Sequence, residues 1–165
     1  MKKIKFSDLS LSKEVQKAVY ELGYEEATPI QSEAIPVLLK RKDIIGQAQT
    51  GTGKTAAFTL PMIEILGSGR AKARMPRSLI LSPTRELATQ SANYFETYGK
   101  HLNLQMALLI GGVGMDEQWR RLDRGVDVLI ATPGRLLDHF ERGKLMLTGI
   151  QIMVVDEADR MLDMG

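Results

Sequence analysis

The residues best suited to chemistry form a glycine-rich segment that ends in a lysine and a threonine. The segment reads Ala48, Gln49, Thr50, Gly51, Thr52, Gly53, Lys54 and Thr55. It follows an apolar run at residues 43–46 and precedes a helical pattern at 56–66. Glycines let successive backbone N–H groups turn inward and form a nest for anions, and the start of the following helix adds further N–H groups. The segment therefore predicts a site for the phosphates of a nucleoside triphosphate.

The last two residues of the segment supply a charge and a metal ligand. Lys54 would place its ammonium group near the β- and γ-phosphates, and the Thr55 hydroxyl would bind Mg²⁺. The usual pattern of such loops has a glycine where this chain has Ala48. An incidental flexible loop is the alternative, but the position between an apolar run and a helix favours phosphate binding.

A second candidate group follows the last apolar run of the chain, at residues 150–155. Asp156 and Glu157 stand directly after it. In a triphosphatase Asp156 would hold Mg²⁺ through its water shell, and Glu157 would polarise the water that attacks the γ-phosphate. Alternatively, the carboxylates favour the dipole of a helix predicted at 158–164. The phosphate-binding segment in the same chain favours the catalytic interpretation.

The elements that must position these residues alternate along the chain. Apolar runs of strand length occupy residues 43–46, 78–81, 105–110, 126–131 and 150–155. Helices are predicted at 11–22, 31–39, 56–66, 86–99, 115–122 and 135–141. The runs are near-continuous, which is typical of strands covered on both faces. The pattern predicts an α/β fold, a doubly wound, mostly parallel sheet with helices on both faces, whose ligands bind beyond the C-terminal ends of the strands.

The amino-acid composition limits the kinds of protein and of partner that the sequence can represent. The 165 residues make one domain's worth of chain, with 44% hydrophobic residues for a core and a net charge of only +2, so a nucleic acid would need a local basic surface. The absence of cysteine excludes disulfides and thiol chemistry. His101 and His139 are expected to be solvated or satisfied helix residues rather than a metal pair. No apolar run approaches the ~18 residues of a membrane span, and we expect a cytoplasmic protein.

Together the motifs resemble those of the DEAD-box ATP-dependent RNA helicases, and their residues are most similar to those of bacterial members. Asp156, Glu157, Ala158 and Asp159 spell the name of the family. The phosphate segment matches the family's form A-x-T-G-x-G-K-T, which accounts for Ala48. The resemblance implies a RecA-like P-loop domain that uses ATP and Mg²⁺, with Thr55 and Asp156 at the metal. It also implies that Lys54, Asp156 and Glu157 are catalytic.

The stretch before the phosphate segment resembles the family's adenine-sensing Q motif. The matching residues are Phe6, Gly23, Tyr24, Thr28, Pro29, Ile30 and Gln31, with Ala27 where a proline is commoner. The resemblance implies that Thr28 and Gln31 bind ATP and that Tyr24 stacks on the base, although Tyr24 could be an ordinary core or surface aromatic. Thr28 and Gln31 also fit a capping box, in which the Gln31 amide serves the Thr28 N–H. One amide cannot fully serve both roles, so both remain open.

Three further motifs resemble the RNA-contacting motifs of the family's first RecA-like domain. They are Pro83, Thr84 and Arg85, then Gly111 and Gly112, then Thr132, Pro133, Gly134 and Arg135. Helix starts at these places would bind successive phosphates of one strand, and the glycines would admit a close backbone. Plain helix capping is the alternative, with Arg135 paired to Asp138. None of these residues is suited to reading base edges, so RNA binding should be largely sequence-independent and salt-sensitive.

The resemblance also implies a domain organisation. Residues 1–40 would form an N-terminal helical extension with the Q motif, and 41–165 an incomplete RecA-like ATP-binding domain. In the family a further strand lies between the phosphate-loop strand and the Asp156 strand, and a second RecA-like domain supplies arginine fingers. We therefore expect the 165-residue chain alone to bind nucleotide weakly, to hydrolyse it very slowly, to leave RNA duplexes intact and to be marginally stable, because sheet edges lack their neighbours.

Three functions follow from these observations. The first is an ATP-dependent RNA helicase, an ATP hydrolase that couples nucleotide turnover to RNA binding and duplex remodelling. The second is a non-catalytic ATP- or RNA-binding module. The third is a P-loop ATPase that acts on DNA or protein, against which the signatures at 28–31 and 132–135 argue.

Overall fold

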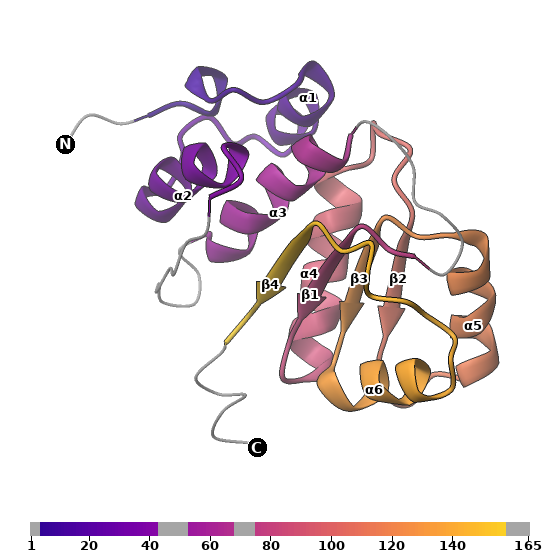
Figure 1. Cartoon of the computed structure of the whole chain (residues 1–165). Coiled ribbons are helices and arrows are strands. Elements are labelled where there is room, and N and C mark those ends of the chain that lie inside the picture. Colours follow the sequence, from indigo (N-terminus) through magenta and orange to yellow (C-terminus); the bar gives the residue numbers. More distant parts are fainter. Residues whose placement is uncertain (1–3, 43–52, 68–74, 158–165) are drawn as a thin grey trace. The chain divides into compact units, whose positions relative to one another are not determined.

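The computed structural model describes residues 4–42, 53–67 and 75–157 (Figure 1). The chain divides into two compact units, the first made of Met1–Ser68 with Asn93–Asn103 and the second of Gly69–Ala92 with Leu104–Gly165. Helix α4 (Arg85–Tyr98) begins in the second unit and ends in the first. Within the described ranges, no helix is long and apolar enough to cross a membrane.

The first unit is helical. A short 3₁₀ helix at Phe6–Asp8, which the sequence pattern did not predict, precedes α1 (Lys13–Glu21), α2 (Pro29–Leu39) and α3 (Lys54–Leu66). Helix α2 packs against α3. The large apolar side chains of the first unit that have no exposed surface include Val15, Ile35, Leu60, Ile63 and Leu66. The Ser12 hydroxyl accepts a hydrogen bond from the Val15 N–H and caps α1, while the Ser12 N–H donates to Glu64 of α3 at 2.8 Å.

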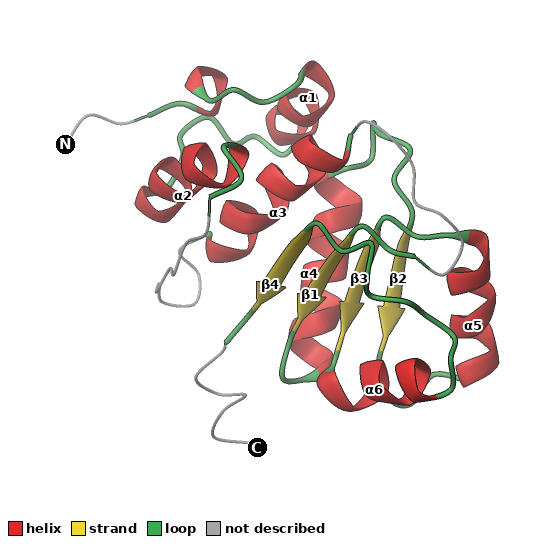
Figure 2. Cartoon of the chain, in the orientation of Figure 1, coloured by secondary structure: helices red, strands yellow, loops and turns green. Residues whose placement is uncertain are grey.

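The second unit contains a parallel sheet of four described strands. These are β1 (Ser78–Leu81), β2 (Met106–Leu109), β3 (Val128–Ala131) and β4 (Ile152–Val155), in the spatial order β2-β3-β1-β4 (Figure 2). Helix α5 (Met115–Arg124) connects β2 to β3, and α6 (Pro133–Glu141) follows β3. The parallel, doubly wound prediction is confirmed. The strand predicted at 43–46 and the helix predicted at 158–164 lie outside the described residues.

Both faces of the central strands are buried, which explains their near-continuous apolar sequence. On one face Leu79 and Leu129 pack in a cluster with Leu122 of α5 and Leu136 of α6. On the other face Ile80, Val128 and Ile130 have no exposed surface. Strand β4 differs, because Met153 and Val155 are 57% and 45% exposed. This exposed apolar surface agrees with marginal stability, which stays a prediction.

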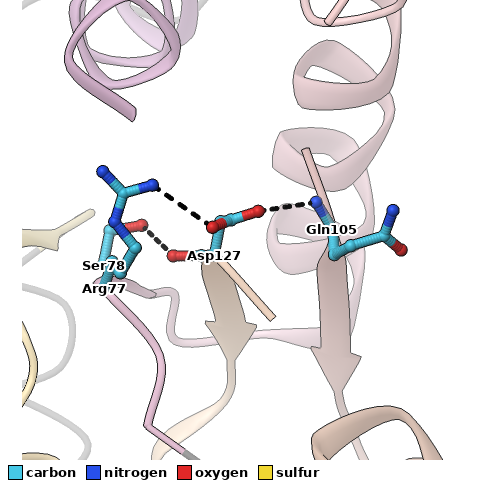
Figure 3. A network of polar contacts seen from close by, with 4 residues as sticks. All are labelled: Arg77, Ser78, Gln105 and Asp127. Carbon is cyan, nitrogen blue, oxygen red and sulfur yellow. Dashed lines mark hydrogen bonds and ion pairs between the residues drawn. The ribbon is translucent and has the colours of Figure 1, made fainter. Parts of the chain in front are cut away.

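The N-terminal ends of three strands are tied together by one buried carboxylate (Figure 3). Asp127 lies just before β3, and its Oδ1 pairs with Arg77 Nη1 at 3.3 Å. Its Oδ2 accepts the Gln105 N–H at 3.0 Å, and its backbone carbonyl accepts the Ser78 hydroxyl at 2.9 Å. Because these residues begin β1, β2 and β3, the pairing lies at the edge of the sheet opposite the C-terminal ends. The loops that follow the strands therefore share a rigid base.

Candidate functional site

The start of α2 forms the predicted capping box. The Thr28 hydroxyl accepts the Gln31 N–H at 3.4 Å, and the Gln31 side-chain oxygen accepts the Thr28 N–H at 2.9 Å. Pro29 occupies the first helical position, where its fixed φ suits the helix and its missing N–H is not needed. The structural role expected from the Thr28 and Gln31 pattern is thus confirmed, and Gln31 is only 6% exposed.

The same glutamine also reaches the end of the phosphate segment. Gln31 Nε2 donates to the carbonyl of Gly53 at 3.2 Å, so each end of its amide has a partner. Gly53 has a left-handed φ of 83°, and a Cβ there would collide with Gln31 Nε2. A glycine is therefore required twice over, by backbone conformation and by the close approach of the amide. Contact between Gln31 and adenine stays a prediction.

The phosphate segment is described only from Gly53 onward. Helix α3 begins at Lys54, two residues before the predicted start at 56, and Thr55 lies in its first turn. The other predicted residues of the segment, Ala48, Gln49, Thr50, Gly51 and Thr52, lie outside the described residues. What the structure describes is therefore a helix N-terminus preceded by a left-handed glycine, an arrangement that favours bound anions.

Tyr24, the predicted adenine-stacking residue, is half exposed. The pKa of Tyr98 in the same unit is raised by burial, with smaller contributions from the phenols of Tyr24 and Tyr94. Tyr94 and Tyr98 stack with their ring centroids 5.8 Å apart. Half of the Tyr24 surface is therefore open, and a stacking role for it stays a prediction.

The loops after β1, β2 and β3 carry the three predicted RNA motifs. The motif Pro83–Arg85 follows β1, the paired glycines follow β2, and Thr132 is the N-cap residue of α6 after β3. The Thr84 hydroxyl accepts the Leu87 N–H at 3.2 Å and so caps α4. The Thr132 side chain makes no capping hydrogen bond to the described first turn of α6. Since the strands are adjacent and parallel, all three motifs gather at one edge of the sheet.

Two arginines join these loops by hydrogen bonds. Arg85 Nη1 donates to the carbonyl of Gly111 at 3.1 Å, and Arg135 Nη1 donates to the carbonyl of Val113 at 3.2 Å. Gly112, with a left-handed φ of 83°, lies so close that a Cβ would collide with Arg85 Nη1. The loop after β2 is thus held from both sides by the motif arginines.

The two acidic residues at the end of β4 differ in backbone conformation. Asp156 is 7% exposed, and its N–H donates to the carbonyl of Leu81 at 2.8 Å. Glu157 adopts a left-handed φ of 53°, which is uncommon for a residue with a side chain. Such conformations cost energy and occur preferentially at functional sites. Within the described ranges no group of three or more histidines and carboxylates is arranged to hold a metal ion.

Two buried residues beside the glycine loop were not predicted as site residues. Gln118 of α5 is 4% exposed and His139 of α6 is fully buried, and their side chains are hydrogen-bonded at 2.6 Å. The expectation of a satisfied helix residue holds for Nε2 of His139, whereas its buried Nδ1 has no hydrogen-bond partner among the described residues. His101 contacts Glu21 at 2.8 Å, and the Lys100 ammonium, followed by His101, lowers the pKa of that carboxyl. The only signal for Gln118 was a polar residue on an otherwise apolar helix face.

Comparison with known proteins agrees with this arrangement. The family model of the DEAD/DEAH box helicases matches residues 28–165. The ATP-dependent RNA helicases RhlB of Shewanella piezotolerans and Shewanella woodyi are 47% and 48% identical, each over 98% of this chain. A crystal structure of a DEAD box protein from Methanococcus jannaschii superposes with a TM-score of 0.89 and 38% identity, over 99% of this chain and 44% of that one.

The chain belongs to the DEAD/DEAH box helicase family. A hypothetical ATP-dependent RNA helicase from Sulfolobus tokodaii has the same fold, with a TM-score of 0.85 and 35% identity over 94% of this chain and 44% of that one. The chain spans 38% and 37% of the length of the two Shewanella relatives.

Proposed function

We propose that this chain forms the ATP site and part of the RNA site of an ATP-dependent RNA helicase. The observation that carries the proposal is the gathering of three motif loops at the C-terminal edge of a parallel sheet, joined by Arg85 and Arg135. In doubly wound folds this edge is where ligands bind. The names of the Shewanella relatives support the activity. A helicase that acts on RNA would work in the cytoplasm.

The nucleotide half of the proposal assigns ATP to the region around the start of α3. Lys54, at the first position of α3, would add charge near the β- and γ-phosphates, and the preceding residues 48–53 would wrap them. Thr55 and Asp156 would hold Mg²⁺, since hydroxyl and carboxylate oxygens are the hard ligands that this ion prefers. The buried position of Asp156 would keep its carboxylate oriented, and Glu157 would polarise the attacking water.

The RNA half of the proposal assigns the sugar-phosphate backbone to the three loops. The side chains of Arg85 and Arg135 donate exposed hydrogen bonds to loop carbonyls, so their charge lies beside the loop and is open to a phosphate. Gly111 and Gly112, together with Thr84, Thr132 and the first turns of their helices, would contact phosphates and sugars. Such contacts fix the position of a strand without reading its bases. Pro83, Pro133 and Gly134 would shape the same surface.

The test is nucleotide turnover by a full-length protein that carries this chain. Single-stranded RNA should accelerate ATP hydrolysis, whereas DNA of the same sequence should not, since 2′-hydroxyl contacts distinguish the two. Stimulation by DNA alone would instead support an ATPase that acts on DNA. Replacing Glu157 by Gln should abolish turnover and leave ATP binding intact. ATP binding with no turnover in the unsubstituted protein would favour a non-catalytic module.

A further inference from the structure

A buried chain of hydrogen bonds links α6 to the loop after β2. Gln118 Nε2 donates to the carbonyl of Ile110 at 3.0 Å. His139 Nε2 lies 2.6 Å from Gln118 Oε1. Both side chains are buried, with 4% of Gln118 and none of His139 exposed. These two hydrogen bonds therefore lie in the protein interior and end on Ile110, the residue that precedes Gly111.

The direction of every bond in this chain is determined by the glutamine. Because its nitrogen donates to Ile110, its oxygen must accept, so His139 Nε2 carries the hydrogen. His139 Nδ1 is then the acceptor end of a neutral ring, and it has no hydrogen-bond partner among the described residues. Burial lowers the pKa of His139, and the neighbouring Arg135 lowers it further. A neutral imidazole thus keeps the glutamine in one orientation.

Three side chains consequently hold three carbonyls of a single loop. Gln118 holds Ile110, Arg85 holds Gly111 and Arg135 holds Val113. We propose that Gln118 and His139 are positioning residues, which hold the glycine loop in the conformation that contacts RNA. This inference rests on the proposed function, because the purpose of the positioning is RNA contact.

The buried hydrogen bond from Gln118 to Ile110 should contribute more to the conformation of the loop than the two arginine bonds. The bonds made by Arg85 and Arg135 are exposed, so water can replace either partner at little cost. The bond from Gln118 to Ile110 is buried, and its loss would leave a carbonyl without a partner in the interior. The loop should therefore rearrange when Gln118 is changed.

Two substitutions of Gln118 test the link. Gln118→Met keeps the length of the side chain and removes both bonds, whereas Gln118→Glu keeps an acceptor for His139 and removes the donor to Ile110. In ¹⁵N-labelled chain, the backbone amide signals of Gly111 and Gly112 should shift in both variants. Affinity for a labelled single-stranded oligoribonucleotide should fall roughly three- to tenfold in both. In Gln118→Glu the pKa of His139 should also rise, because a carboxylate now faces the ring.

Two substitutions of His139 test the hydrogen bond between His139 and Gln118. His139→Leu removes the donor that orients the glutamine and should give the same shifts and the same loss of RNA affinity. His139→Gln can place an amide N–H near the position of Nε2. It should therefore restore most of the original amide signals of Gly111 and Gly112 and most of the RNA affinity. Failure of His139→Gln to recover more than His139→Leu would remove His139 from the positioning role.

The matched control is Ser78→Ala. It deletes a buried hydrogen bond to the carbonyl of Asp127 at the opposite edge of the sheet, so it should lower stability without moving the glycine amides. If Gln118→Met moves Gly111 and Gly112 no more than Ser78→Ala does, the positioning role is wrong. If the unsubstituted chain shows no RNA affinity, the proposed function fails instead, and the glycine amides still decide whether Gln118 holds the loop.

Discussion

The side-chain amide of Gln31 donates a hydrogen bond to the backbone carbonyl of Gly53 over 3.2 Å, and so connects the first turn of α2 to the residue before α3. The other end of the same amide accepts the Thr28 N–H. A residue expected to contact adenine therefore also braces the phosphate segment. Adenine that competes for this amide would act directly on the carbonyl next to Lys54.

Gln31→Glu should lower the affinity for ATP by more than its effect on stability can explain. The carboxylate keeps an acceptor for the Thr28 N–H but loses the donor to Gly53 and repels the phosphates, so affinity should fall roughly tenfold. Ser12→Ala is the control, because it removes the cap of α1 at a cost of about 1 kcal/mol and leaves the Gly53 bond in place. Titration with a fluorescent ATP analogue compares the two. Equal losses of affinity would contradict the bracing role of Gln31.

Gly112→Ala should reduce RNA binding beyond its effect on stability. The left-handed backbone at Gly112 costs any other residue about 1 kcal/mol, and the new methyl group would displace the Arg85 guanidinium. Gly143→Ala is a matched control, because Gly143 also has a positive φ, of 69°, but has open space around it. Both variants should lose similar stability in thermal unfolding. Only Gly112→Ala should lose RNA affinity, and a similar loss in Gly143→Ala would count against the loop.

Asp127→Ala should lower the free energy of unfolding by about 2–4 kcal/mol, since it removes the buried carboxylate that accepts from Arg77 and from the Gln105 N–H. Asp127→Asn keeps an acceptor oxygen and should cost less. Chemical denaturation measures both. Because Asp127 lies at the N-terminal edge of the sheet, RNA affinity measured well below the unfolding transition should not change. A loss of affinity there would show that the two edges are coupled.

Burial of His139 should make stability depend on pH. Its pKa is lowered in the folded chain by burial, then by Arg135 and Arg142, against the opposing effect of Asp138; the facing side chain of Gln118 is neutral. The unfolded state therefore binds a proton below about pH 6.5 that the folded state does not. This contribution is fully present above that pH and is lost as the pH falls toward the folded pKa. The difference in unfolding free energy between the unsubstituted chain and His139→Gln should shrink in that window, and a constant difference would contradict it.

Much of the fold could be predicted because its signals are local. The run at 78–81 became β1 without adjustment, since strands buried on both faces are apolar throughout. The capping box at Thr28 and the helix start at Thr84 also follow from neighbouring residues. Contacts between distant residues could not be predicted in this way. Gln118 and His139 are separated by 21 positions and meet only because α5 and α6 pack on the same face of the sheet.

The most direct measurement of the central claim is the binding of a single-stranded oligoribonucleotide to ¹⁵N-labelled chain, followed by the backbone amide signals. The largest shifts should fall on Arg85, Gly111, Gly112 and Gly134, and they should weaken as salt is raised. The signals of Arg77, Gln105 and Asp127 at the opposite edge should stay in place. Shifts confined to that opposite edge, or no shifts at any RNA concentration, would contradict the assignment of RNA to the loops after β1, β2 and β3.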